Sequence, residues 1–280
     1  MMISRKNGSN LLDRGDYLAS YKEGYVAFLD ILGFSHYIEN ADADNVAKLF
    51  DFIKRLKSLF NSNTGIEMDF FSDSIILMTN THELSSFLFP IYLAESYLAK
   101  ELGLLFRGAV TFGKYYHDNT NSFGPGIVKA YQLGEGANYS RIIIDDALSV
   151  PENSIDFFID LDGSKCFNVY SFMLFQDIPQ EYDGTEYKKD ELFSIVLNSL
   201  SEIRADILRL CDLYWQEKHI DKYLWRTVPF NYLCDYICKN PETFDYLEKH
   251  YTVFSPKEAE QIRKKKIAID EILCEEVNLL

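Results

Sequence analysis

The sequence predicts an α+β fold, in which helices cross over a mainly antiparallel sheet. Short apolar runs that suit buried strands alternate with longer segments whose apolar residues recur at three- and four-residue steps, as they do on one face of a helix. Two of the apolar runs, IEMDFF and SIILMT, are separated only by Ser72 and Asp73, which is typical of a hairpin.

The elements of the first half follow the order β-α-ββ-α-β, with one more helix and strand attached. The run YVAFLD, residues 25–30, suits a strand that is buried on both faces. Over residues 42–61 apolar side chains recur at helical spacing, with lysines and an arginine between them. After the two hairpin strands we expect a helix over 83–101, a strand in LLFRGAVTFG, a loop in HDNTNSFGPG, a short helix in IVKAYQLGE and a strand in RIIID.

Three regions are predicted along the chain. Residues 1–20 are polar and charged and form an N-terminal lead-in, residues 21–185 carry the α+β domain, and residues 186–280 form a mainly helical C-terminal extension. In the extension, apolar residues from Val196 to Tyr214 recur in steps of four and three, a seam that packs on the first domain or on a second subunit. A last helix is predicted to begin at Ser255, with the pattern of a capping box.

Composition argues against several classes of function. The 28 lysines and arginines against 43 aspartates and glutamates give a formal charge of -15, which repels a nucleic-acid backbone. No run of about 18 to 20 uncharged apolar residues is present, and the N-terminus MMISRKNGSN has no apolar core of a signal peptide. We therefore expect a cytoplasmic protein that binds neither nucleic acid nor membrane.

Two aspartates interrupt apolar strands in a way that predicts a metal site. Asp30 ends the first predicted strand and Asp73 lies at the hairpin tip, so both carboxylates are expected at one edge of the sheet. An ionised carboxylate in such a place is expensive to desolvate without a cation or donors beside it. Mg²⁺ is commonly held by one or two carboxylates together with substrate phosphates. Either aspartate alone would read as a turn cap, whereas the pair favours a metal.

The segment FLDILGF adds a predicted phosphate contact. After Asp30 the backbone of Leu32, Gly33 and Phe34 is expected to turn sharply, and glycine permits amide groups to approach phosphate oxygens closely.

Four motifs in the first half of the chain resemble those of a known family. FLDILGF, FSDSIIL, FRGAVTFG and FGPGIVKAYQLGEGANYSRIIID occur in the order and at about the spacing of the class III nucleotidyl cyclase domain, over roughly residues 22–147. The resemblance is closest to the bacterial pyrimidine nucleotide cyclases of the Pycsar anti-phage defence system. AYQLGEGANYSRIIID looks like that branch's fourth motif, and KYLWRTVPFN at 222–231 looks like its C-terminal extension.

The resemblance implies a ferredoxin-like βαββαβ core, a homodimer with composite sites, and a lyase that converts a nucleoside triphosphate to its 3′,5′-cyclic monophosphate and pyrophosphate. It implies that Asp30, Asp73 and the carbonyl of Ile31 bind two Mg²⁺ or Mn²⁺ ions. One ion would lower the pKa of the ribose 3′-hydroxyl and the other would neutralise the leaving pyrophosphate. A separate effector would respond to the cyclic nucleotide.

The chain departs from the family at the positions that steady the transition state. Class III cyclases carry an asparagine and, four residues later, an arginine, where this chain has Val128 and Gln132. Neither replaces a guanidinium. Arg141, expected to face the partner's half-site, and Arg107 are the candidate substitutes, although Arg107 is equally interpreted as the structural partner of an acidic neighbour. Lys165 either reaches phosphates or is a solvated turn lysine.

The positions that read the base also differ from purine cyclases, which place a lysine where this chain has Asp69 and an acidic residue where it has Asn121. A buried donor or acceptor without a match costs about 1 to 3 kcal/mol, so the changed pair indicates a changed base edge. This predicts UTP or CTP as substrate. Two alternatives stay open: an adenylate cyclase with an unusual base pocket, and an inert cyclase-like module that binds nucleotide or a partner.

Overall fold

The computed structural model describes residues 21–61, 65–81, 83–118, 120–152, 154–175, 189–214 and 220–239. The predicted lead-in over 1–20 and the last helix predicted from Ser255 lie outside these residues. Within them, no helix is both long and apolar enough to cross a membrane.

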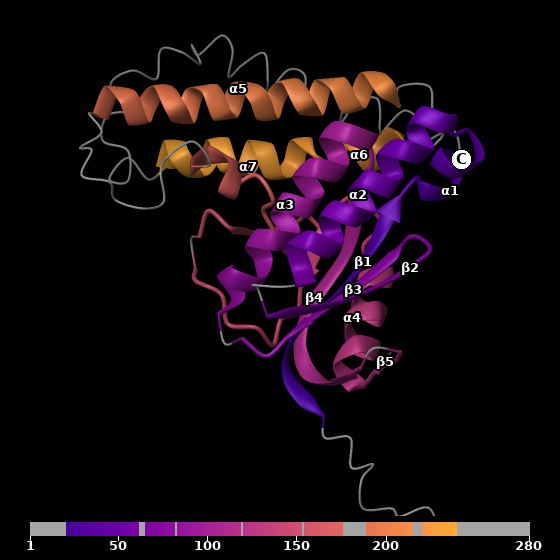
Figure 1. Cartoon of the computed structure of the whole chain (residues 1–280). Coiled ribbons are helices and arrows are strands. Elements are labelled where there is room, and N and C mark those ends of the chain that lie inside the picture. The colour runs from indigo at the N-terminus through magenta and orange to yellow at the C-terminus, as the bar shows by residue number, and fades with distance from the viewer. Residues whose placement is uncertain are drawn as a thin grey trace, which may run out of the picture.

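The centre of the molecule is a mixed sheet in the order β2-β3-β1-β4-β6-β8-β7, with β5 paired to β4 (Figure 1). Its neighbours are antiparallel except for β4 and β6, which are parallel. The strands are β1 (Lys22–Leu32), β2 (Ile66–Phe71), β3 (Ser74–Thr79), β4 (Leu105–His117), β5 (Ser122–Phe123), β6 (Ile142–Ile144), β7 (Phe157–Ile159) and β8 (Lys165–Phe167). The first four strands, in the order β2-β3-β1-β4, form a ferredoxin-like unit, as predicted.

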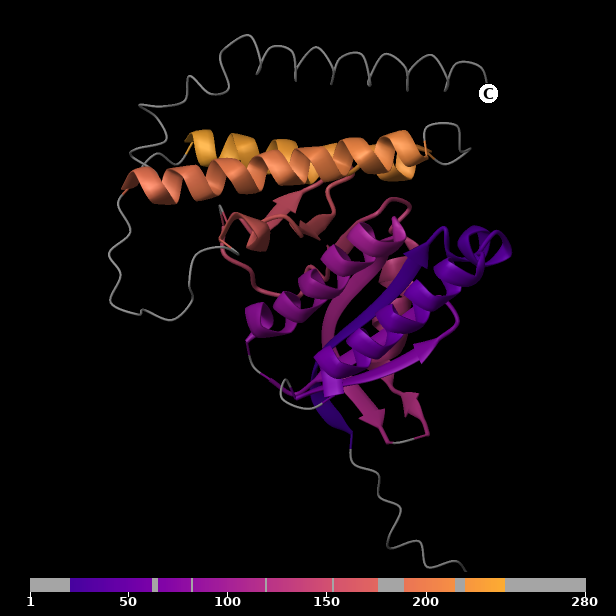
Figure 2. The same ribbon diagram turned by 45° about the horizontal axis from the view of Figure 1, so that its top comes forward.

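Helices cover both faces of this sheet (Figure 2). The helices are α1 (Phe34–Glu39), α2 (Ala43–Asn61), α3 (Leu84–Leu102), α4 (Pro125–Glu135), α5 (Lys189–Leu213), α6 (Ile220–Leu224) and α7 (Thr227–Lys239), with a 3₁₀ turn η1 (Phe172–Phe175). Leu29 and Ile31 of β1 belong to the cluster that α2 and α3 cover, whereas Val26 packs with Ile127 and Ala130 of α4. Because side chains alternate along a strand, Asp30 lies on the face that α4 covers only in part.

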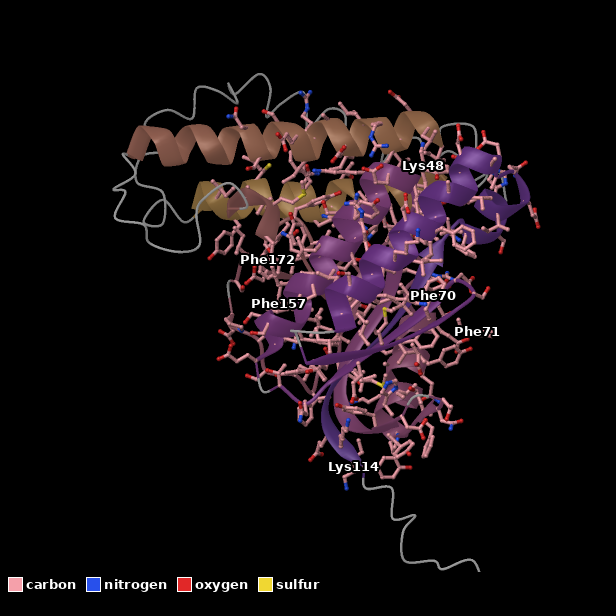
Figure 3. The ribbon with its side chains drawn as sticks, viewed as in Figure 1. Lys48, Phe70, Phe71, Lys114, Phe157 and Phe172 are labelled. Atoms are coloured by element: carbon pink, nitrogen blue, oxygen red, sulfur yellow. The ribbon has the colours of Figure 1, made fainter. Side chains whose placement is uncertain are left out.

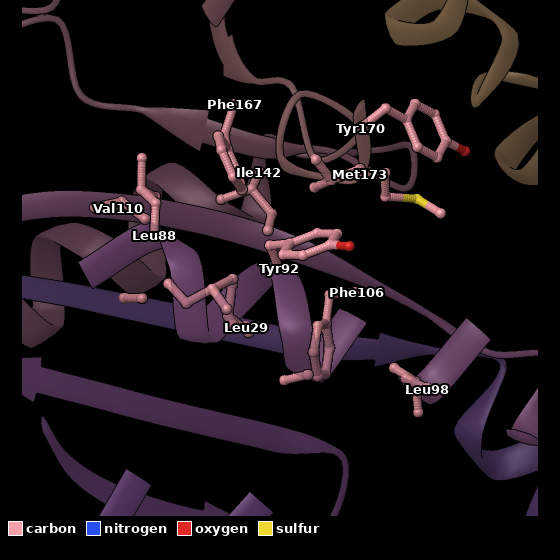
Figure 4. Close-up of a cluster of buried hydrophobic side chains, with 14 of the residues drawn as sticks. Leu29, Leu88, Tyr92, Leu98, Phe106, Val110, Ile142, Phe167, Tyr170 and Met173 are labelled. Atoms are coloured by element: carbon pink, nitrogen blue, oxygen red, sulfur yellow. The ribbon is translucent and has the colours of Figure 1, made fainter. Parts of the chain in front are cut away.

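The helical extension shares the main hydrophobic core of the α+β domain. Leu200, Ile203 and Ile207 of α5 and Leu233 of α7 are buried in the same cluster as Leu29 of β1. Figure 4 shows part of this cluster, in which Tyr92 of α3 lies between Phe106 of β4 and Met173 of η1. The apolar seam of α5 therefore packs on the first domain, which decides between the two interpretations that the sequence left open.

Candidate active site

Asp30 and Asp73 meet at one end of the sheet, as the sequence predicted. Asp30 lies two residues before the end of β1, opposite Ser74 of β3, and Asp73 forms the turn between β2 and β3. The amide of Ile31 donates to the carbonyl of Asp73 at 2.8 Å, which fixes the turn against β1. Ser72 reaches the left-handed region, with φ 57, to close this turn. The β1–β3 pairing and the turn between β2 and β3 thus position the two carboxylates.

The pKa of Asp30 is shifted by the groups that surround its carboxylate. Burial raises its pKa above the ordinary value, the hydrogen bond and charge of Arg107 oppose the rise, and the nearby Asp73 carboxylate adds to it. The upward shift of the pKa means that burial disfavours the ionised form of Asp30 more than Arg107 stabilises it. A divalent cation between the two carboxylates would supply positive charge that favours the ionised form.

Arg107 lies directly opposite Asp30 in the β1–β4 pairing. Its Nε donates to Asp30 Oδ2 at 2.7 Å, and its Nη2 lies 2.6 Å from the same oxygen. Arg107 is thus the partner of an acidic neighbour, one of the two interpretations from the sequence. Its side chain stays 35% exposed, so the guanidinium remains accessible at the edge of the site.

The predicted phosphate loop follows directly after β1. Gly33 has φ 79 and caps α1, whose Tyr37 amide donates to the Gly33 carbonyl at 2.9 Å. A Cβ at this position would be strained by the backbone conformation and would lie 3.0 Å from the hydroxyl oxygen of Tyr223 in α6. The extension therefore reaches the loop formed by Leu32, Gly33 and Phe34.

The donor set of this site fits a hard divalent cation. Carboxylate and carbonyl oxygens are the ligands that Mg²⁺ and Mn²⁺ take. Among the described residues, no group of three or more histidine, cysteine, aspartate or glutamate side chains is placed to hold a metal. Asp30 and Asp73 therefore provide a two-carboxylate site that needs further oxygen ligands, such as substrate phosphates.

Arg141 is not brought to this site. Its guanidinium donates to Asp160 Oδ2 and Asp162 Oδ2 of its own chain, at 2.5 and 2.6 Å, and to the carbonyl of Gly136 at 3.2 Å. Only 3% of the residue is exposed. The expectation that Arg141 faces a partner's half-site is therefore corrected by the structure, because two aspartates of the β7–β8 turn hold it inside its own subunit.

Lys165 is not brought to the site either. Its Nζ donates to the carbonyl of Leu148 at 3.0 Å. Register explains this placement: Phe28, Ala109, Ile143 and Cys166 pair successively across the sheet and share the face of Asp30, so Lys165 lies on the opposite face. The interpretation in which Lys165 reaches phosphates is thus corrected.

Asp69 lies on the same sheet face as Asp30, as alternation predicted. It pairs with Ile76, which pairs with Phe28. Sequence reasoning missed His117, whose Nδ1 lies 3.8 Å from Asp69 Oδ2 and 2.7 Å from Ser122 Oγ. Asn121, next to Ser122, donates from Nδ2 to Thr120 Oγ1 at 2.6 Å. His117 at the end of β4 therefore approaches Asp69, whereas the Asn121 side chain bonds within its own turn.

Phe71 is a second residue that sequence reasoning missed. It lies between Asp69 and Asp73, opposite Ser74, and 82% of it is exposed. Figure 3 shows Phe71 at the outer edge of β2. An exposed aromatic residue therefore lies on the sheet face that Asp30 occupies, with Ser74 between the two.

No model of a protein family matches this chain, and no curated protein matches it in sequence. The adenylyl cyclase CyaB from P. aeruginosa is 15% identical over 46% of this chain and 79% of its own, with a TM-score of 0.38. The guanylyl cyclase Cya2 is 13% identical over 53% and 92%, with a TM-score of 0.38. A bacterial light-regulated adenylyl cyclase is 12% identical over 64% and 99%, with a TM-score of 0.38.

At these identities and scores the likeness concerns the fold alone. The assignment of the ferredoxin-like unit accordingly rests on the strand order and register described above.

The raised pKa of Asp30 predicts a stability effect. We expect Asp30→Asn to raise the thermal unfolding midpoint of the metal-free chain at neutral pH, because folding disfavours the ionised carboxylate. This difference in unfolding midpoint should vanish at a pH below the pKa of aspartate in the unfolded chain, because the aspartic acid of the wild type and the asparagine of the variant are then both neutral. Unfolding in a chelator across a pH series measures this. A lower midpoint for Asp30→Asn at neutral pH would show that pairing with Arg107 outweighs burial.

Proposed function

We propose that this chain is a divalent-metal-dependent nucleotidyl cyclase that converts UTP or CTP to the 3′,5′-cyclic monophosphate and pyrophosphate. The meeting of Asp30 and Asp73 at one end of the sheet is the observation that carries the proposal. The ordered motifs of FLDILGF and FSDSIIL support it, because they place these two aspartates in the context that class III cyclases use.

Asp30, Asp73 and the carbonyl of Ile31 would hold two divalent cations. When bound, one would activate the ribose 3′-hydroxyl and the other would offset the charge of the leaving pyrophosphate. The backbone of Leu32, Gly33 and Phe34 would contact phosphate oxygens, since the left-handed Gly33 keeps side-chain bulk away from them. Arg107 would turn from Asp30 to the phosphates once a cation neutralises that carboxylate, and its exposure leaves it room to do so.

We propose that the working form is a homodimer. The exposed side of α4 carries Val128 and Tyr131, and Tyr131 packs edge-on against Phe28 of β1, two residues before Asp30. Solvent-exposed apolar side chains next to a candidate site are typical of a surface that a second subunit covers. The partner's α4 would then close the site, although Val128 and Gln132 supply no charge for the transition state.

The base would be read by Asp69 together with Asn121. A carboxylate accepts a hydrogen bond from the exocyclic amine of cytosine or from N3–H of uracil, and repels the N1 acceptor of adenine. His117 lies beside Asp69 and adds a group that donates or accepts according to its tautomer. These contacts favour a pyrimidine. The cyclic product would act on a separate effector, in a cytoplasmic defence response to phage.

One observation favours a second candidate. Arg107 pairs with Asp30, Arg141 is held by Asp160 inside the chain, and α4 itself contains no arginine that could stabilise a transition state. An inert module that binds nucleotide without cyclising it would have this arrangement.

Incubation of the purified chain with UTP, CTP, ATP or GTP and Mn²⁺, followed by mass detection of cyclic products, tests the proposal. We expect UTP or CTP to be turned over at least about tenfold faster than ATP, which corresponds to about 1.4 kcal/mol in transition-state binding. Equal rates with ATP would overturn the choice of base. Binding of a nucleotide without any cyclic product would favour the inert module.

A further inference from the structure

Two adjacent residues of the extension, Trp225 and Arg226, enter the α+β domain at the junction of α6 and α7. They are 8% and 2% exposed. Their side chains contact different parts of the domain: Trp225 packs with Phe158 and Cys166 of the β7–β8 hairpin, and Arg226 pairs with Glu95 of α3. Both routes lead from there to the first residues of β4.

The first route runs through Glu95. Arg226 Nη2 forms an ion pair with Glu95 Oε1, and both residues are at most 3% exposed. The other carboxylate oxygen, Oε2, accepts the backbone amide of Phe106 at 2.9 Å. Arg226 therefore fixes the carboxylate that holds one end of the segment 106–108.

The second route runs through Asp160 and Arg141. Trp225 Nε1 donates to Asp160 Oδ2 at 3.0 Å, and the same oxygen accepts from Arg141 Nη1. The carbonyl of Arg141 accepts the amide of Gly108 at 3.0 Å. Arg226 supports this route too, because its Nε donates at 3.2 Å to Ser140 Oγ, next to Arg141.

The two routes end in hydrogen bonds to the backbone amides of Phe106 and Gly108, the residues on either side of Arg107. Arg107 itself binds Asp30. Movement of this segment would be transmitted to β1 because the backbones are close: a Cβ at Gly108 would lie 2.0 Å from the carbonyl oxygen of Phe28. We infer that Trp225 and Arg226 are positioning residues, through which the helical extension sets the backbone position of Arg107 next to Asp30. The catalytic part of this inference rests on the proposed function.

Two variants test it with the full chain. Trp225→Phe keeps a large ring and removes only the N–H that reaches Asp160. The double variant Glu95→Gln with Arg226→Met removes the ion pair without leaving a buried charge, and it keeps an acceptor for the Phe106 amide. Arg209→Ala is the matched control, because the arginine belongs to the same extension but contacts the carbonyl of Ala99 in α3 and Asp206 of its own helix.

Amide hydrogen exchange and steady-state kinetics are then measured. We expect faster exchange at Gly108 in Trp225→Phe and at Phe106 in the double variant, with exchange in the β2–β3 hairpin unchanged. We expect kcat to fall about tenfold with KM changed less than about twofold, because misplacement of catalytic groups by roughly 1 Å costs up to about a hundredfold. Arg209→Ala should match the wild type in both measurements.

Folded variants with wild-type exchange at Phe106 and Gly108 and wild-type kcat would overturn the inference. Loss of protection across the whole sheet together with the loss of kcat would also overturn it, since that shows a general loss of stability. A wild-type chain without turnover refutes the proposed function instead, and the exchange at Phe106 and Gly108 then decides alone whether Trp225 and Arg226 position this segment.

Discussion

Asp30→Asn and Asp73→Asn are each expected to lower kcat by at least about a hundredfold, while the chain stays folded. Removing one preorganised group that stabilises developing charge costs about 10²- to 10³-fold, and an amide is a much weaker ligand for a divalent cation than a carboxylate. Because both carboxylates serve one site, the double variant should lose little more than either single variant.

Kinetics of cyclic-product formation with Mn²⁺ measures this effect. Asp51→Asn is the matched control, because Asp51 is an exposed aspartate on α2 that pairs with Lys54 of the same helix. Its kcat should equal that of the wild type. Turnover that survives both Asp30→Asn and Asp73→Asn would discard the two-carboxylate assignment.

Arg226→Ala is expected to cost about 3 to 5 kcal/mol in the free energy of unfolding, the usual cost of removing one partner from a buried ion pair. Glu95 is 3% exposed and would be left charged and unpaired beside the Phe106 amide. Replacing both partners, as Glu95→Gln with Arg226→Met, should recover most of this loss, because neutral side chains carry no such desolvation penalty.

Urea denaturation followed by circular dichroism measures the difference. Arg209→Ala removes a partly exposed arginine of the same extension and should change the free energy by less than about 0.5 kcal/mol. A loss of less than about 1 kcal/mol in Arg226→Ala would mean that the pair contributes as little as a surface ion pair.

Elements with a strong local pattern were predictable from the sequence. The apolar repeat over 42–61 became α2, Ala43–Asn61, and the break at Ser72 and Asp73 became the turn of a hairpin. Asp30 and Asp73 could be placed together for the same reason, since each interrupts an apolar strand near its end. The approach of the two aspartates needed only the hairpin to add to the first strand, which places Asp30 opposite Ser74, the neighbour of Asp73.

The roles of Arg141, Lys165 and His117 were not predictable in this way. Arg141 is held by Asp160 and Asp162, whose turn has no local signature of an arginine partner. The sheet face on which Lys165 lies depends on the register of a three-residue strand, because a shift of one residue moves every side chain to the other face. His117 depends on how the end of β4 approaches Asp69, a residue of a different strand that lies far away in the sequence.

The extension also makes contacts with the α+β domain that its sequence did not predict. The seam of α5 predicted a packing surface, but the tie between the α6–α7 junction and β4 depends on single polar atoms of Trp225 and Arg226. Such contacts leave no periodic pattern. The structure nevertheless places them close to the residues that the sequence singled out, because Phe106 and Gly108 flank Arg107.

Binding of Mn²⁺ tests whether Asp30 and Asp73 together form a metal site. Electron paramagnetic resonance of free Mn²⁺, titrated into the chain with a non-cyclisable analogue of UTP, measures this without turnover. We expect the wild type and Asp51→Asn to bind Mn²⁺ equally, and Asp30→Asn and Asp73→Asn each to bind at least about tenfold more weakly. Wild-type affinity in both Asp30→Asn and Asp73→Asn would show that these carboxylates do not bind the cation.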